Sequence, residues 1–169
     1  MQTAGIAARI DAFNVALGKA TSWLTLFMVV VTFVIVVLRY LFGVGLIWLQ
    51  ESVTWMHAAV FMLGAAYTLQ QEEHVRVDIF YRDMSERGKA LVNAVGVLIF
   101  IFPLCGFLFV EALGYVGASW SDHEVSRNSG GLPYPFVPLI KSALLFMPLT
   151  VALQGVSMLL NSALIVRKG

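Results

Sequence analysis

Residues 20–38, with the sequence ATSWLTLFMVVVTFVIVVL, contain no Asp, Glu, Lys or Arg. Three further stretches share this property: residues 52–71, 90–110 and 142–166. Each is about 19 to 25 residues long, and at about 1.5 Å per residue such a helix crosses a hydrocarbon core of roughly 30 Å. The sequence therefore predicts an all-α integral membrane protein with four transmembrane helices.

We expect these helices to form a single four-helix domain over residues 1–169. The third run continues beyond Glu111 to Trp120 without a proline, so its helix extends past the membrane. Asn128, Gly130 and Pro133 then predict a turn before the fourth span. The predicted spans are approximately 20–41, 52–71, 90–118 and 140–166.

The composition agrees with a chain that faces lipid. Of the 169 residues, 59% are apolar and 12% are charged, and the mean hydropathy is +0.83. Soluble domains carry about 45–50% apolar and 25% charged residues, so a water-soluble enzyme is not expected. The net charge of +1 leaves no basic field for nucleic acid. The single cysteine, Cys105, cannot form an internal disulfide or a thiolate metal cage.

The basic residues indicate an orientation in the membrane. Lys and Arg accumulate in cytoplasmic loops. Most of them precede the first span, follow the fourth, or lie between the second and third: Arg9, Lys19, Arg76, Arg82, Arg87, Lys89, Arg167 and Lys168. The other side holds Arg39, Arg127 and Lys141. We therefore expect both termini and the central loop to be cytoplasmic.

Two short segments outside the spans carry weaker patterns. In the N-terminal segment, Ile6, Ile10, Phe13 and Leu17 recur at helical spacing, which predicts either an amphipathic helix on the cytoplasmic membrane surface or a frayed lead-in to the first span. Residues 74–89 mix apolar side chains with charges of both signs, which predicts a short interfacial helix.

Polar and small residues follow stripes along three spans, at steps of three and four residues. We expect these stripes to point away from lipid, either in ordinary helix packing or in a transport pathway or contact with a separate membrane protein. The stripes are Thr54, His57, Phe61, Gly64, Thr68 and Gln71 in the second span, Thr150, Gln154, Ser157 and Asn161 in the fourth, and Thr21, Thr25, Thr32 and Arg39 in the first.

Two single residues carry specific hypotheses. His57 is the only histidine within a span, but a bis-histidine haem needs a second one, and His74 and His123 fall in loops. Glu51, at the mouth of the second span, either pairs with Arg39 in a structural clamp or meets a partner. The chain has no sign of the inverted repeats and broken helices typical of secondary transporters, so we expect no transport by this chain alone.

Several segments together resemble the small membrane subunit of tripartite ATP-independent periplasmic (TRAP) transporters, the DctQ-like family. Gln50 departs from the family, which often has a second acid beside Glu51. The segments are Arg39-Tyr40-Leu41-Phe42-Gly43, Trp48 with Glu51, Gly64-Ala65, His74-Val75-Arg76-Val77-Asp78, Ser126, Asn128, Gly131-Leu132-Pro133 and Gln154.

The resemblance implies a subunit of a sodium-coupled tripartite importer of carboxylate-bearing solutes in the bacterial inner membrane. In such systems a periplasmic binding protein delivers solute to a large polytopic membrane subunit that carries solute and ions. The small subunit would then be a scaffold in contact with that large subunit, the binding protein and membrane lipids. It would hold no cofactor, because sodium coupling is expected on the large partner.

The resemblance also suggests roles for particular residues. The alternative for each is an ordinary structural or solvated position. The candidate subunit-interface or structural residues are Arg39, Trp48, Glu51, His57, His74, Arg76 and Asp78, and the candidates for docking the binding protein are Asp122, Glu124 and Arg127.

Three other classes compete with this interpretation. A membrane anchor of a redox enzyme is also a small helical bundle, but the spans contain no pair of histidines. A small multidrug exporter needs an acid in its first span, and residues 20–38 contain none. The small subunit of a tripartite tricarboxylate transporter has a comparable layout and is separated from the TRAP assignment by the quoted motifs alone.

Overall fold

The computed structural model describes residues 2–71, 81 and 83–168, and it is helical with no strand in those ranges. Four of its helical stretches are long and apolar enough to cross a membrane, which confirms the predicted all-α fold with four spans. In chain order the elements are α1 (Gln2–Leu41), α2 (Ile47–Gln70), α4 (Glu86–Gly96), the π-helical segment η1 (Val97–Ile101), α5 (Phe102–Ser121) and α6 (Phe136–Lys168).

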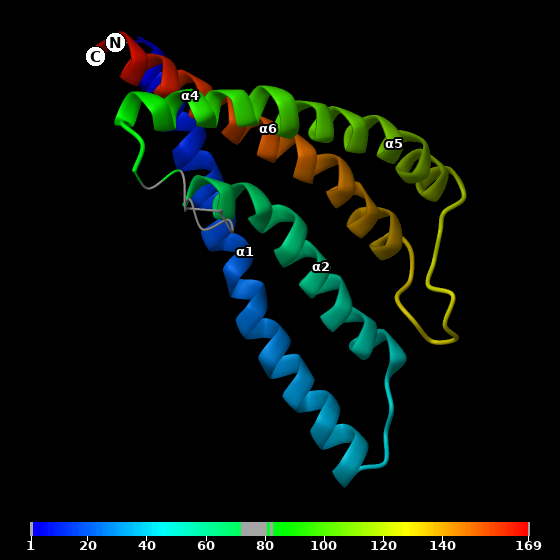
Figure 1. The fold of residues 1–169 in the computed structure, drawn as a ribbon. Coiled ribbons are helices and arrows are strands. Elements are labelled where there is room, and N and C mark those ends of the chain that lie inside the picture. Colours follow the sequence, from blue (N-terminus) through cyan, green and yellow to red (C-terminus); the bar gives the residue numbers. More distant parts are fainter. Residues whose placement is uncertain (1, 72–80, 82, 169) are drawn as a thin grey trace.

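The helices form two antiparallel hairpins, α1 with α2 and α4–η1–α5 with α6 (Figure 1). Both termini lie at one end, the terminal end, while the α1–α2 turn and the loop of residues 122–135 lie toward the other, the loop end. Helix α6 packs against α1, α2, α4 and α5, so it is the central element. Toward the loop end α1 diverges from α5 and α6.

The N-terminal segment is part of the first spanning helix. Helix α1 runs without interruption from Gln2 to Leu41, so the predictions of a separate surface helix or a frayed lead-in are both wrong. Its apolar side chains Ile6 and Phe13 are about half exposed, whereas Asn14 is fully buried. The segment packs its polar face against α6 and turns its apolar face outward, as suits a helix whose surroundings are apolar.

The third span bends around Pro103. Proline lacks the N–H that an α-helix needs in its interior. Just before it, η1 widens the helix so that the N–H of Phe102 bonds to the carbonyl of Val97, five residues back. Such π-helical insertions absorb a local disruption without ending the helix. The α4–η1–α5 stretch therefore stays continuous from Glu86 to Ser121.

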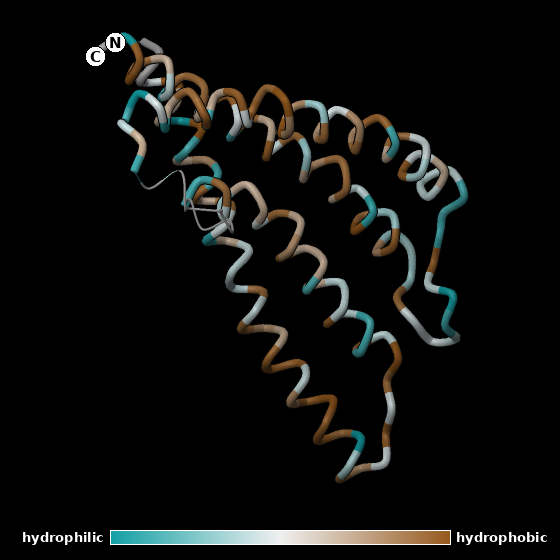
Figure 2. Tube along the Cα trace, viewed as in Figure 1, coloured by the Kyte–Doolittle hydropathy of each residue, from teal (hydrophilic) through white to brown (hydrophobic). Residues whose placement is uncertain are grey.

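Small residues fill the interior. The buried apolar set is dominated by alanines from every long helix: Ala7, Ala59, Ala66, Ala90, Ala112 and Ala143. At Gly18 an added Cβ would lie 2.3 Å from the ring of Tyr67, so α1 and α2 approach more closely than any side chain would permit. Small residues at helix contacts are typical of packing in lipid. Large apolar residues are instead exposed on the surface of the chain. Apolar residues occur along all four spans (Figure 2).

Candidate interaction surfaces

At the loop end, the carboxylate of Glu51 joins helix α2 to the 122–135 loop. Its Oε1 accepts hydrogen bonds from Ser126 Oγ at 2.5 Å and Asn128 Nδ2 at 2.7 Å. Its Oε2 accepts one from the backbone N–H of Leu132 at 2.7 Å. The residues that contact Glu51 thus lie 75 to 81 positions away in the sequence.

The predicted clamp between Glu51 and Arg39 is wrong. Among the residues that the structure describes, no hydrogen bond or ion pair joins these two side chains, and Arg39 is exposed at the end of α1. The reason is that the loop occupies the space beside the Glu51 carboxylate. Trp48, one turn before Glu51, has an exposed side chain, and its backbone N–H donates to the carbonyl of Gly130 at 3.0 Å.

Two glycines allow the loop to approach α2, which confirms the predicted turn. Gly130 has a φ of 77°, in the left-handed region that favours glycine. At Gly131 a Cβ would lie 2.3 Å from Ser126 Oγ and 2.6 Å from Glu51 Oε2, so a side chain has no room there. The Ser126 N–H also donates to the carbonyl of Leu132 at 3.2 Å. The loop is therefore closed on itself as well as on α2.

The first part of this loop is held by Glu124. Its carboxylate accepts a hydrogen bond from the Lys141 ammonium, with which it forms an ion pair, and another from Ser119 Oγ at 2.6 Å. These bonds, that from Lys141 foremost, hold the pKa of Glu124 below its ordinary value. The Lys141 ammonium also lies 4.0 Å from the centre of the Tyr115 ring. Of the predicted docking residues, Glu124 is thus engaged within the chain, whereas Asp122 and Arg127 are exposed.

The polar stripes have different surroundings. In α6, Thr150, Gln154 and Ser157 are buried, as expected, although Asn161 is exposed. The first-span stripe is buried only at Thr21.

In α2 this chain leaves much of the stripe uncovered, so packing within the chain does not account for the stripe and the expected contact with a separate membrane protein stays a prediction. Thr54, His57 and Phe61 are exposed, and Phe61 retains 75% of its surface. Toward the terminal end the stripe continues as one wall of an open groove between α1 and α2, of about 550 Å³, lined by Gly64 and Thr68. We call Thr54, His57, Phe61, Gly64 and Thr68 the α2 stripe.

At the terminal end, a polar network joins α1 to α6. Asn14 Nδ2 donates to Gln154 Oε1 at 2.8 Å, and Gln154 Nε2 donates to Asp11 Oδ1 at 2.9 Å. Ser157 Oγ donates to the same Asp11 oxygen at 2.7 Å. Gln154 and Ser157 were predicted to face inward, whereas Asp11 and Asn14 were not among the predicted residues. The sequence pattern that could have identified them is the polar stripe of the first span. Its spacing of three and four residues extends back toward the N-terminus through Thr21, Gly18, Asn14 and Asp11.

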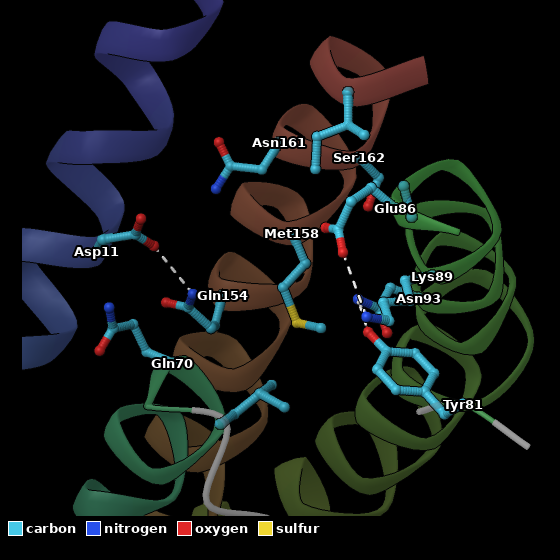
Figure 3. A pocket seen from close by; sticks show the side chains of 13 residues that line it. Asp11, Gln70, Tyr81, Glu86, Lys89, Asn93, Gln154, Met158, Asn161 and Ser162 are labelled. Carbon is cyan, nitrogen blue, oxygen red and sulfur yellow. Dashed lines mark hydrogen bonds and ion pairs between the residues drawn. The ribbon is translucent and has the colours of Figure 1, made fainter. Parts of the chain in front are cut away.

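Beside this network lies a polar cavity of about 470 Å³ between α1, α2, α4 and α6 (Figure 3). Asp11 and Gln154 line one side of it, and the Glu86–Lys89 ion pair, 3.2 Å between Oε1 and Nζ, lies on the other. The predicted structural residues His74, Arg76 and Asp78 lie outside the described residues, as do residues 74–80 and 82 of the predicted interfacial helix.

The fold and these contacts define a class: a multi-pass helical membrane protein whose polar side chains join its helices and loops. In the described part of the chain, no group of three or more His, Cys, Asp or Glu residues could hold a metal ion.

Comparison with known proteins identifies the family. The family model of the DctQ component of tripartite ATP-independent periplasmic transporters matches residues 28–164. The chain therefore belongs to this family of TRAP transporter small permease subunits.

A curated relative agrees with this assignment. The C4-dicarboxylate TRAP transporter small permease protein DctQ of Vibrio cholerae serotype O1 is 30% identical over 70 residues. The match covers 41% of this chain and 30% of the relative's length. No solved structure matches the chain.

Proposed function

We propose that this protein is the small permease subunit of a sodium-coupled importer of carboxylate-bearing solutes in the bacterial inner membrane. It braces the large polytopic membrane subunit and helps dock the periplasmic binding protein. In this arrangement both termini are cytoplasmic and the loop end is periplasmic. The solute and sodium sites belong to the large subunit, and lipids cover the remaining apolar surface.

The observation that carries the scaffold role is the exposed α2 stripe. Thr54 and His57 are exposed on a helix long and apolar enough to span the membrane. A polar group that faces lipid has no hydrogen-bonding partner there, so polar residues within spans normally face another protein surface. The groove at Gly64 adds a place where a second helix can approach closely. A neighbouring membrane subunit fits both features.

The scaffold role is tested by filling that groove. A Cβ at Gly64 meets nothing within 4 Å, so this chain has room for the first side-chain carbon of Gly64→Leu, which adds bulk on the α2 stripe. Gly106→Leu is the matched control, because Gly106 on α5 is equally open. We expect Gly64→Leu to lower the amount of large subunit that co-purifies in mild detergent and Gly106→Leu to preserve it. Undiminished recovery with Gly64→Leu would contradict the contact at this face.

The loop end supports the docking role. Glu51 and Glu124 hold the 122–135 loop in place, and Asp122 and Arg127 present charges on its exposed surface. Charges at the rim of an interface chiefly accelerate association and orient the partner. The transport activity itself is tested by reconstituting the co-purified membrane subunits with the binding protein and measuring carboxylate uptake with and without a sodium gradient. Uptake that ignores the gradient would contradict sodium coupling.

A further inference from the structure

We infer that Glu51 is a positioning residue that orients Arg127 toward an acidic surface of the docking partner. This inference rests on the proposed docking role of the 122–135 loop. It adds to that role the side chain that fixes the loop and the charge of the surface that the loop recognises.

Arg127 lies between two residues that Glu51 holds. The residues on either side of it, Ser126 and Asn128, both donate side-chain hydrogen bonds to Glu51 Oε1, at 2.5 and 2.7 Å. Arg127 itself has an exposed side chain and no hydrogen bond or ion pair to another residue in the described part of the chain. Both neighbours are held against α2, so the backbone from which the exposed Arg127 side chain extends is fixed, at the edge of an open cavity of about 640 Å³ that Glu51 and Glu124 also line.

The Glu51 site requires a group that only accepts hydrogen bonds. All its partners donate: the hydroxyl of Ser126, the amide of Asn128 and the backbone N–H of Leu132. A carboxylate accepts through both oxygens, and charge-assisted bonds are stronger than neutral ones. A glutamine has one accepting oxygen and one donating nitrogen. It could bond to all three partners only if Ser126 and Asn128 turned to accept hydrogen bonds from its nitrogen, so it should hold the loop less firmly.

The exposed charge points to the nature of the partner. The acids around Arg127 differ in their surroundings: Glu124 of the loop pairs with Lys141, Glu51 of α2 is occupied by its donors, and Asp122 at the start of the loop is exposed. Arg127 thus forms no hydrogen bond or ion pair in the described part of the chain, although its charge also helps to lower the pKa of Glu124. A guanidinium matches carboxylates in planar, bidentate geometry. The matching partner surface is therefore acidic, at the point where the binding protein meets the loop.

The test measures loop order and docking separately. Loop order is read in the complex from the mobility of a nitroxide label on Ser129→Cys in a Cys105→Ala background, since Cys105 is the one cysteine of the chain. Docking is read as the half-saturating concentration of the binding protein in solute uptake by the reconstituted complex. The variants are Glu51→Ala, Glu51→Gln, Arg127→Gln and the combination of Glu51→Ala with Arg127→Gln. Glu111→Gln is the matched control for label mobility, because Glu111 is an exposed acid on α5.

We expect Glu51→Ala to increase label mobility and to raise the half-saturating concentration by about tenfold, as for the loss of one charged contact, without changing the maximal uptake rate. Glu51→Gln should give a smaller effect in the same direction. In the Arg127→Gln background, Glu51→Ala should raise the half-saturating concentration no further, because the cation it positions is gone. A role of Glu51 in folding alone would not produce this dependence.

Three results would overturn the inference. Unchanged label mobility in Glu51→Ala would show that Glu51 does not hold the loop. Increased mobility with unchanged docking, while Arg127→Gln still weakens docking, would show that Arg127 acts without this positioning. If neither Arg127→Gln nor Glu51→Ala alters docking, the proposed docking role of the loop fails, and the inference fails with it.

Discussion

Replacing Gln154 with leucine should destabilise the contact between α1 and α6 more than any other single polar substitution in α6. Gln154 is 3% exposed and bonds to both Asn14 and Asp11. Interhelical hydrogen bonds in membranes contribute about 0.6 kcal/mol each, so the two lost bonds account for about 1 kcal/mol. Asn14 is fully buried and its Oδ1 already has no partner, so the variant strands the whole amide. A stranded buried polar group costs about 1–3 kcal/mol, which brings the expected loss to about 2–4 kcal/mol.

The assay is equilibrium unfolding of the purified protein from mild detergent into SDS, followed by tryptophan fluorescence. Asn161→Leu is the matched control, because Asn161 lies two turns further along α6 but is exposed. The double variant Asn14→Leu with Gln154→Leu should be less destabilised than the sum of the two single variants, since no amide is then stranded. If Gln154→Leu unfolds at the same SDS fraction as Asn161→Leu, the network contributes nothing and the reasoning is refuted.

Two further predictions concern packing and pH. Gly18→Ala should destabilise the α1–α2 hairpin by about 1–3 kcal/mol through overpacking against the Tyr67 ring, and Tyr67→Ala should relieve part of that loss, as measured by the same unfolding assay. The pKa of Glu124 is lowered from 4.5, so its ionised form stabilises the loop at pH values above 4.5 and this stabilisation is lost as the pH falls through the folded-state pKa. Label mobility at Ser129→Cys should therefore be constant from pH 7 to 5 and rise in more acidic solution, and a mobility that rises equally in Lys141→Met would contradict the assignment.

The sequence predicted part of the loop-end site. Glu51, Ser126 and Asn128 were all singled out, but Glu51 was expected to pair with Arg39, which is near it in the sequence. Its actual partners lie 75 to 81 residues away. Charge and local spacing show that a carboxylate needs partners. They do not show which distant segment supplies them.

The network at the terminal end shows the same limit. Gln154 and Ser157 were expected to face inward, which their burial confirms, yet Asp11 lies more than 140 residues from both. The apolar pattern of Ile6 and Phe13 suggested an amphipathic helix on the membrane surface or a frayed lead-in, whereas this segment continues α1, with both side chains about half exposed. In an apolar solvent the preference for burying apolar side chains reverses, because polar groups are the ones that need protein partners.

The sequence by itself determined the number and the helical nature of the spans, because a chain segment in lipid must satisfy its own backbone hydrogen bonds. It also determined the family, through short motifs. Only the tertiary structure decided which stripe is covered: the α6 stripe around Gln154 is buried, while the α2 stripe around His57 is open. Both stripes have the same spacing along their helices, and what buries one of them is the neighbouring helix that the fold places against it.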